Sequence, residues 1–466
     1  MQILNRTQVI NLKRIMMYRF LFSLLFSVLL LTGYSQEKTN IWSLDKSIAY
    51  AQENNIQINR SKLSIESVEQ DELNAKASMF PSLNANLNQG FNFNTNAFTG
   101  ATTRGTQQNG NYNANLSFDL FRGLSKMKQI KQSQTDLMVN KLETDRMKND
   151  ISLNISTAYL QILFQKELLK VAIEQVSITK LQVGRIEKLY NAGGVPHSDL
   201  LDIRAQLAND ELTEIQVENA MYLAYVDLVQ LMQLPVEDQV GFDIEIPNLD
   251  SYEEQDFLIT PGEVYKASLS VMPEVERDRK AIESSELTQS VVKGNYWPSL
   301  VFSAGAGTRY NDNILNDQSD QASGTLPWGT QFNDNLNYFT TVSLRIPIYN
   351  GLAVRTSAQK AEISVRDAQF RFEQTKTNLE QAIQKAYYDA RAAKQKYLAS
   401  QIAVDALVES FAYSQLKFEE GVINQVEYNQ VKTNLTKAQS DLVQSKYDYI
   451  FRLKILDFYQ GKLLTF

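Results

Sequence analysis

The sequence predicts a mixed α+β membrane protein in which long antiparallel helices continue from four membrane-spanning strands per chain. One supporting observation is a proline-free segment of helical periodicity that is too long for a compact domain. Another is a set of alternating apolar and polar runs, each about as long as the ~9–11 residues that cross a bilayer as a tilted strand. Both features occur twice, which indicates an internal tandem repeat.

The long helix is expected at residues 124–190, which contain no proline and a single internal glycine, Gly184. Its apolar or small residues recur alternately four and three apart, with Gln165 as the one polar interruption: Ile151, Ile155, Ala158, Ile162, Leu169, Ala172 and Val176. This spacing is the seam of a helix packed lengthwise on another helix. At ~1.5 Å per residue the segment would reach roughly 100 Å, so it belongs to a rod, a coiled coil or a tube.

The same arrangement returns 228 residues later (387 − 159), where Tyr387 corresponds to Tyr159. The offset carries the seam onto an equivalent set: Leu379, Ile383, Ala386, Ala390, Ala393, Tyr397, Ser400 and Val404. We therefore expect two structural repeats, at 36–234 and 261–466. An acidic stretch at 235–260 joins them and is interpreted as a solvated connector without a site.

The N-terminus is typical of a secretion signal at residues 1–35. An apolar run at 20–31 follows basic residues, and the small residues Gly33 and Ser35 predict cleavage before Gln36. The alternative is a single transmembrane anchor. The apolar run is shorter than the ~20 residues that a spanning helix needs, which favours the signal.

Composition excludes several classes of function. There is no cysteine, so neither disulfides nor thiolate metal sites are available. A net charge of −7 without a basic cluster argues against nucleic acid as a partner. The one histidine, His197, follows Pro196 in a turn and lacks any nucleophile motif, so it is interpreted as a solvated turn residue. We expect no catalytic activity, no cofactor and no metal site.

The first hairpin follows a helix expected at 41–77 and begins at Pro81, within "MFPSL". Apolar residues then alternate with asparagine and serine in two runs. They are Leu83, Ala85, Leu87, Phe91 and Phe93, then Tyr112, Ala114, Leu116, Phe118 and Leu120. The runs predict a hairpin with one apolar face and one small polar face.

The second hairpin begins at Pro298, within "YWPSL", and its second run is expected at 338–348. Positions expected to face lipid are Leu116, Phe118, Phe302, Val342, Leu344 and Ile346. The alternative is an ordinary half-buried sheet over a soluble core. Four strands cannot close a barrel, and lipid does not tolerate unpaired edges. Copies of the chain must therefore join, and a trimer would supply twelve strands.

Each long helix is expected to end at a glycine turn, formed by Gly193 and Gly194 in the first repeat and by Gly421 in the second. Glycine permits a left-handed helix terminus without steric cost. Return helices are expected at about 198–234 and 425–459.

The order and spacing of these segments resemble the TolC-type outer membrane efflux and secretion channel family. The likeness rests on the repeat, on "FPSL" and "WPSL", on the strand ends "LFRGL" and "IYNGL", and on the turns "YNAGGVPHSDLL" and "FEEGVINQVEY". It implies a homotrimer with a twelve-stranded barrel in outer membrane lipid and a tube of twelve helices across the periplasm. It also implies a passive conduit for tripartite efflux or type I secretion, docked to a periplasmic adaptor (membrane fusion) protein and an inner membrane pump of the RND, ABC or MFS type.

The resemblance also predicts which residues line a periplasmic aperture. The family carries a carboxylate six residues after the turn glycine, which corresponds to Asp199 and Glu427. Three residues further on, its best known member has a second acid where this chain has Gln430. Carboxylates gathered by threefold symmetry at a constriction attract cations and repel one another. The alternative for Glu427 is a solvated carboxylate at the start of a helix, favoured by the helix dipole.

Two further positions depart from the family. Its closed state uses an arginine just after the second glycine turn and a tyrosine just before it, where this chain has Ile423 and Phe418. The familiar polar latch is therefore in doubt, and apolar packing of these residues with Val426 is one interpretation. Simple coiled-coil packing is the other.

A competing hypothesis from another class is a secreted structural or adhesive coiled coil whose alternating runs form a soluble sheet. Extraction discriminates between the two, because a conduit requires detergent and keeps its barrel in unboiled gels.

Overall fold

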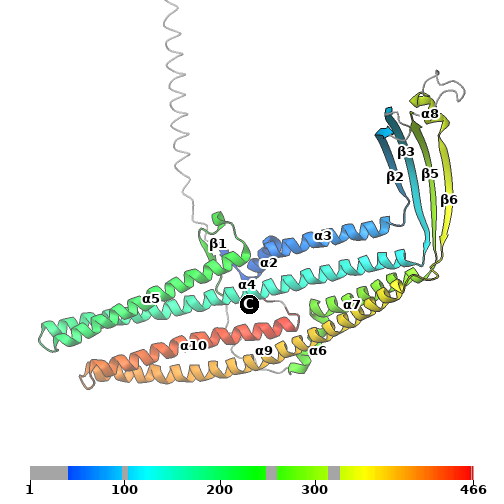
Figure 1. Cartoon of the computed structure of the whole chain (residues 1–466). Helices are drawn as coiled ribbons and strands as arrows, with labels where there is room; N and C mark the ends of the chain where they lie inside the picture. Colours follow the sequence, from blue (N-terminus) through cyan, green and yellow to red (C-terminus); the bar gives the residue numbers. More distant parts are fainter. Residues whose placement is uncertain (1–39, 97–102, 248–259, 313–325, 463, 465–466) are drawn as a thin grey trace, which may run out of the picture.

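The computed structural model describes residues 40–96, 103–247, 260–312, 326–462 and 464. The predicted signal at 1–35 and residues 248–259 of the acidic stretch fall outside these residues. Figure 1 shows an elongated molecule in which helices form one end and a single curved sheet forms the other. Among the described helices, none combines the length and hydropathy needed to cross a bilayer.

The two long helices are confirmed. They are α4 (Ser125–Asn191) and α9 (Ala353–Glu419), and each has 67 residues. Their return helices are α5 (His197–Met232) and α10 (Gln425–Tyr459). The predicted seam is largely buried, with Ile155 on α4 and Ile383 on α9 fully enclosed. Each repeat thus forms an antiparallel helical hairpin in which apolar burial stabilises a lengthwise contact.

The four strands form one antiparallel sheet in the order β2-β3-β5-β6. The strands are β2 (Ser82–Asn96), β3 (Thr103–Arg122), β5 (Ser299–Asn311) and β6 (Asn337–Arg345). The contact between β3 and β5 joins the two repeats. At 15 and 20 residues, β2 and β3 exceed the length expected from their alternating runs.

The register places the apolar positions of neighbouring strands on one face of the sheet. Phe118 pairs with Phe302, and Phe302 pairs with Val342. On the other face Asn86 pairs with Asn113, and their amide groups form a hydrogen bond of 3.2 Å. The sheet therefore has one apolar face and one face rich in small polar side chains.

The expected second run of the second hairpin is too long at its C-terminal end. Strand β6 ends at Arg345, so Ile346 and Ile348 lie beyond the ladder. Pro347 lacks a backbone N–H, and β5, which would be the partner, starts only at Ser299. Ile346 therefore follows the strand instead of forming part of its apolar face.

The shorter helices correct a second prediction. In place of one helix at 41–77, the first repeat has β1 (Asn40–Trp42), α2 (Leu44–Asn54) and α3 (Ile56–Ala77). The second repeat likewise has α6 (Pro261–Val271) and α7 (Pro273–Lys293), followed by a 3-10 turn, η3 (Gly294–Tyr296). The breaks at Asn55 and Met272 are 217 residues apart (272 − 55), and both residues have extended backbone. Pro273 disfavours helix at Met272, whereas the Asn55 side chain caps α3.

The connector is less solvated than expected. After a 3-10 turn, η1 (Val236–Asp238), strand β4 (Phe242–Ile244) pairs in parallel with β1, and Ile244 is buried. The Tyr159 hydroxyl donates to the carbonyls of Trp42 and Glu245 at 3.1 and 2.6 Å, which fastens α4 to this small sheet. Burial raises the pKa of the Tyr159 phenol, so it remains a donor.

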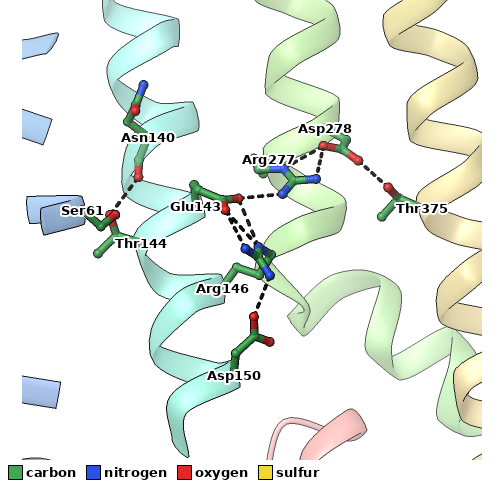
Figure 2. Close-up of polar contacts among 9 residues, drawn as sticks. All are labelled: Ser61, Asn140, Glu143, Thr144, Arg146, Asp150, Arg277, Asp278 and Thr375. Atoms are coloured by element: carbon green, nitrogen blue, oxygen red, sulfur yellow. Dashed lines mark hydrogen bonds and ion pairs between the residues drawn. The ribbon is translucent and has the colours of Figure 1, made fainter. Parts of the chain in front are cut away.

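A polar network joins three helices, α4, α7 and α9, and a separate hydrogen bond joins α3 to α4 (Figure 2). Arg277 of α7 bonds Glu143 of α4 and Asp278 of its own helix, each at 2.6 Å. Asp278 accepts from Thr375 of α9 at 2.6 Å, and Ser61 of α3 shares a hydrogen bond with Thr144 of α4. The hydrogen bond from Arg146 is the main reason that the pKa of Glu143 is lowered, and Arg277 adds to it. The network fixes how helices of the two repeats lie side by side.

Candidate functional site

The site begins with the two turns at the helical end of the molecule. Gly193 and Gly421 have φ angles of 74° and 71°, so each adopts the left-handed conformation. In both turns the next residue, Gly194 or Val422, donates its N–H at 2.8 Å to a carbonyl five residues earlier. This pattern satisfies helix-end carbonyls and reverses the chain in a few residues. Gly194 does not have a positive φ, so of the two adjacent glycines Gly193 alone has a conformation that favours glycine.

Replacing Gly193 by alanine should destabilise the first turn by roughly 1–2 kcal/mol, because a Cβ is strained in the left-handed region. Gly184 offers a matched control within α4, where an added Cβ meets no atom within 4 Å. There alanine should stabilise the helix by about 0.5–1 kcal/mol. Denaturant unfolding measures both variants. Equal destabilisation would show that the turn imposes no special conformation.

The two carboxylates predicted for the aperture occupy equivalent places on the two return helices. Asp199 and Glu427 are each the third residue of a helix, on α5 and α10; Asp199 is half-buried and Glu427 is exposed. The Asn424 side chain caps α10 by accepting from the Glu427 N–H at 2.9 Å. Gln430, one turn further, is exposed and bonds Asn434. Within the described part of the protomer, no hydrogen bond or ion pair joins Asp199 to Glu427.

The second turn is held against the first hairpin by contacts that the sequence did not predict. Arg185 of α4 lies over the Phe418 ring, with its guanidinium carbon 5.5 Å from the ring centroid, and pairs with Glu419 at 3.6 Å. Phe418 stacks on Tyr428 at 4.8 Å between ring centroids, and the Tyr428 hydroxyl accepts from Gln182 at 2.6 Å. An arginine and a tyrosine, the residue types expected from the family's closed state, are therefore present at this turn. They lie at other positions, however: Arg185 belongs to α4 and Tyr428 to α10.

Ile423 and Val426 contribute differently from Phe418. Phe418 packs against a buried cluster that includes Ile186 and Leu200. Ile423 is half-buried, and Val426 is exposed in the protomer. Of the three residues, only Phe418 therefore packs against this buried cluster.

A second unpredicted cluster lies deeper along the same helices. Lys432 of α10 is 3% exposed, and its Nζ lies 3.6 Å from the Asp210 carboxylate of α5. Thr179 of α4 hydrogen-bonds both groups, and Gln206 donates to Asp210 at 2.7 Å. Burial lowers the pKa of Lys432, and Asp210 opposes this shift. The cluster ties the first hairpin to the second repeat through a buried charge pair.

The sequence did contain a signal for this cluster. The buried positions of α10 begin with Gln425, Tyr428, Lys432 and Leu435, which follow the three-four spacing of a seam. A lysine at such a position predicts a buried partner. Arg185 has no comparable signal, because its partners lie on the other repeat.

This arrangement places charged and aromatic side chains at a helix turn. Among the described residues, no group of histidine, aspartate and glutamate side chains could hold a metal ion. The carboxylates of Asp199 and Glu427 can attract cations, and the contacts of Arg185 and Lys432 can hold the two hairpins together.

A sheet with one apolar and one amide-rich face, continued by helices of 67 residues, places the chain in the class of outer membrane channel proteins. The sequence profile described as "Outer membrane efflux protein" matches residues 48–232 and 264–461, and the chain belongs to this family. The chain is therefore a protein of the outer membrane that extends into the periplasm.

Individual relatives agree with this assignment. The chain is 22% identical to the outer membrane protein TolC of Escherichia coli (strain K12) over 304 residues, which is 64% of the chain and 58% of TolC. The match thus spans less than two thirds of that relative. Among solved structures, CusC gives a TM-score of 0.75 at 15% identity, covering 93% of this chain and 96% of CusC. VceC of Vibrio cholerae gives 0.72 at 14% identity, covering 90% and 96%. At these identities the structures support the fold alone.

Proposed function

We propose that three copies of the chain form a passive conduit from the periplasm to the exterior. The observation that carries the proposal is the sheet: β2 pairs only with β3 and β6 only with β5, so the outer edge of each has no partner among the described residues. Lipid does not tolerate such edges, so β2 of one copy pairs with β6 of the next and closes twelve strands. Each copy contributes the repeats 36–234 and 261–466, joined by 235–260.

A second feature supports association of copies. Helix α5 carries a stripe of exposed apolar residues at Leu212, Ile215, Tyr222 and Val226, spaced three, seven and four apart. This is the spacing of a helix seam, and the described residues of the protomer leave the stripe exposed. We assign this stripe to a neighbouring copy in a tube of twelve helices.

The conduit serves a tripartite efflux or type I secretion system. The polar face of the sheet lines the lumen, and the apolar face of the sheet contacts outer membrane lipid. A periplasmic adaptor protein and an inner membrane pump of the RND, ABC or MFS type deliver cargo to the helical end. No catalytic step is assigned to the chain.

Cysteine cross-linking tests the assembly, because the sequence contains no cysteine of its own. In one sheet β2 and β6 are separated by two strands, or about 14 Å, which is too far for a disulfide. Cysteine pairs that scan β2 against β6 should therefore yield covalent trimers in detergent. Purified trimers should also conduct ions across planar bilayers. A water-soluble monomer that forms no cross-linked species would contradict the proposal and favour a secreted structural coiled coil.

The aperture belongs to the same proposal. We assign Asp199, Glu427 and Gln430 to the periplasmic mouth, with Gly193, Gly194 and Gly421 forming its tip. Threefold symmetry then gathers three Glu427 carboxylates, and neutral Gln430 limits the charge of the ring. Contacts of Arg185 and Phe418 hold the mouth in place of the family's polar latch.

Replacing Glu427 by glutamine should weaken block of single-channel current by divalent cations several-fold, because three charges leave the mouth. Glutamine suits the third helix position, so the cap by Asn424 should survive. Glu420 provides the control, since it carries the same charge in the preceding turn and is exposed. Glu420→Gln should leave the block nearly unchanged. An unchanged block in Glu427→Gln would remove this residue from the aperture.

A further inference from the structure

The connection between β5 and β6 contains a short helix, α8 (Trp328–Asp334), which is clamped onto the sheet. The clamp is Gln331, whose side chain is 1% exposed. Its amide donates to the carbonyls of Asn311 and Leu326 at 2.9 and 2.8 Å, and its oxygen accepts from the Asn311 N–H at 3.0 Å. A fully bonded buried amide fixes α8 against the far end of β5.

The helix lies beside a part of β5 for which the described residues supply no partner strand on the β6 side. Pairing of β5 with β6 begins only at Gly307 and Asn337, so β5 continues beyond it. There the Thr308 hydroxyl donates to the Phe332 carbonyl at 2.7 Å, and Asn335 donates to the Arg309 carbonyl at 2.9 Å. These bonds seal the edge of β5 through backbone groups and polar side chains.

Sealing the edge does not require the aromatic side chains that α8 carries. Trp328 and Phe332 lie 4.9 Å apart between ring centroids, and each lies 6.1 Å from Tyr112 of β3. The Trp328 indole N–H donates to the Tyr112 hydroxyl at 3.3 Å. Trp328 remains 47% exposed, and Tyr112 shares the apolar face with Leu116. An exposed indole thus lies at the outer end of the apolar face.

The position of this cluster matches the thickness of a bilayer. Along β3, Tyr112 and Phe121 are nine residues apart (121 − 112) and enclose the apolar positions of that strand. At ~3.3 Å per residue and a tilt of about 40°, this spans roughly 23 Å, close to the ~25 Å apolar band of membrane barrels. At the opposite end of the band, Trp297 is 64% exposed. Aromatic residues therefore border the band at both ends.

We propose that α8 is an interfacial anchor that seats Trp328 at the boundary between headgroups and acyl chains of the outer leaflet. This inference rests on the proposed function, since it needs the apolar face to contact lipid. Indole rings favour that boundary because their ring is apolar and their N–H is polar. The clamp by Gln331 holds the anchor at one depth, and the helix carries no cation for phosphate groups.

Tryptophan quenching in liposomes tests the anchor. The chain has three tryptophans, of which Trp42 is buried among the helices and gives a constant background. Trp297→Phe then reports on Trp328, and Trp328→Phe reports on Trp297 as the matched control. The probes are phosphatidylcholine brominated near the headgroup, the same lipid brominated near the chain end, and aqueous acrylamide. We expect bromine near the headgroup to quench Trp328 most strongly.

The control separates the inference from the function on which it rests. If lipid bromine quenches Trp297 while only acrylamide quenches Trp328, the proposal that α8 is an anchor is wrong, whereas the proposed contact of the apolar face with lipid is retained. If lipid bromine quenches neither, the proposed function fails as well. Gln331→Leu removes the three bonds of the clamp and should reduce lipid quenching of Trp328 roughly twofold or more. Unchanged quenching in that variant would overturn the role of the clamp.

Discussion

Replacing Val342 by arginine should prevent recovery of trimer from the membrane. Val342 is 61% exposed in the protomer and lies mid-strand on the apolar face, paired with Phe302. Arginine at the midplane of a membrane barrel costs about 2–4 kcal/mol, and three copies raise this to roughly 6–12 kcal/mol per trimer. The measurement is the yield of heat-sensitive trimer in unboiled gels of the membrane fraction.

Two variants on the same strand are its controls. Thr341 is adjacent and points to the polar face, so Thr341→Arg should leave trimer yield close to that of the unmodified chain. Leu344 shares the face of Val342 but lies nearer the strand end, so Leu344→Arg should have an intermediate effect. If Thr341→Arg proves as harmful as Val342→Arg, the apolar face does not contact lipid.

Local patterns predicted the fold well wherever periodicity reports burial. The seam of α4 could be identified from its four-three spacing, because a helix packed lengthwise must repeat its contacts at that period. The strands were equally clear, since Leu116 and Asn115 point to opposite faces. The same reasoning extended β6 to Ile348, since alternation continues past Pro347 although pairing does not.

Contacts between segments far apart in the chain could not be predicted from the sequence pattern. Pairing of β1 with β4 joins segments about 200 residues apart, and each strand has only three residues, too few for a periodic signal. At the turns, sequence located Gly193 and Gly421 because a left-handed terminus requires an unusual residue. It could not reveal that Arg185 covers Phe418, since nothing in the local pattern of α4 depends on α9.

Lys432→Met should loosen the contact between α10 and the first hairpin by about 3–5 kcal/mol, because it leaves the Asp210 carboxylate buried without its cation. Adding Asp210→Asn should recover most of this loss, since the pair is then replaced by neutral groups of similar size. Hydrogen exchange of the amides around Thr179, Asp210 and Lys432 measures the local opening free energy of the three helices. Equal exchange in Lys432→Met and the unmodified chain would mean that the charge pair does not hold these helices together.

The pH dependence provides an independent test of the same pair. Burial lowers the pKa of Lys432 below its ordinary value of 10.5, so between the two values the unfolded chain binds more protons than the folded one. Stability of this contact should therefore rise with pH across that interval, and the rise should be absent in the Lys432→Met/Asp210→Asn variant. A rise of the same size in both proteins would assign it to another group. A fall in the unmodified chain would mean that Asp210 outweighs burial and raises the pKa of the lysine.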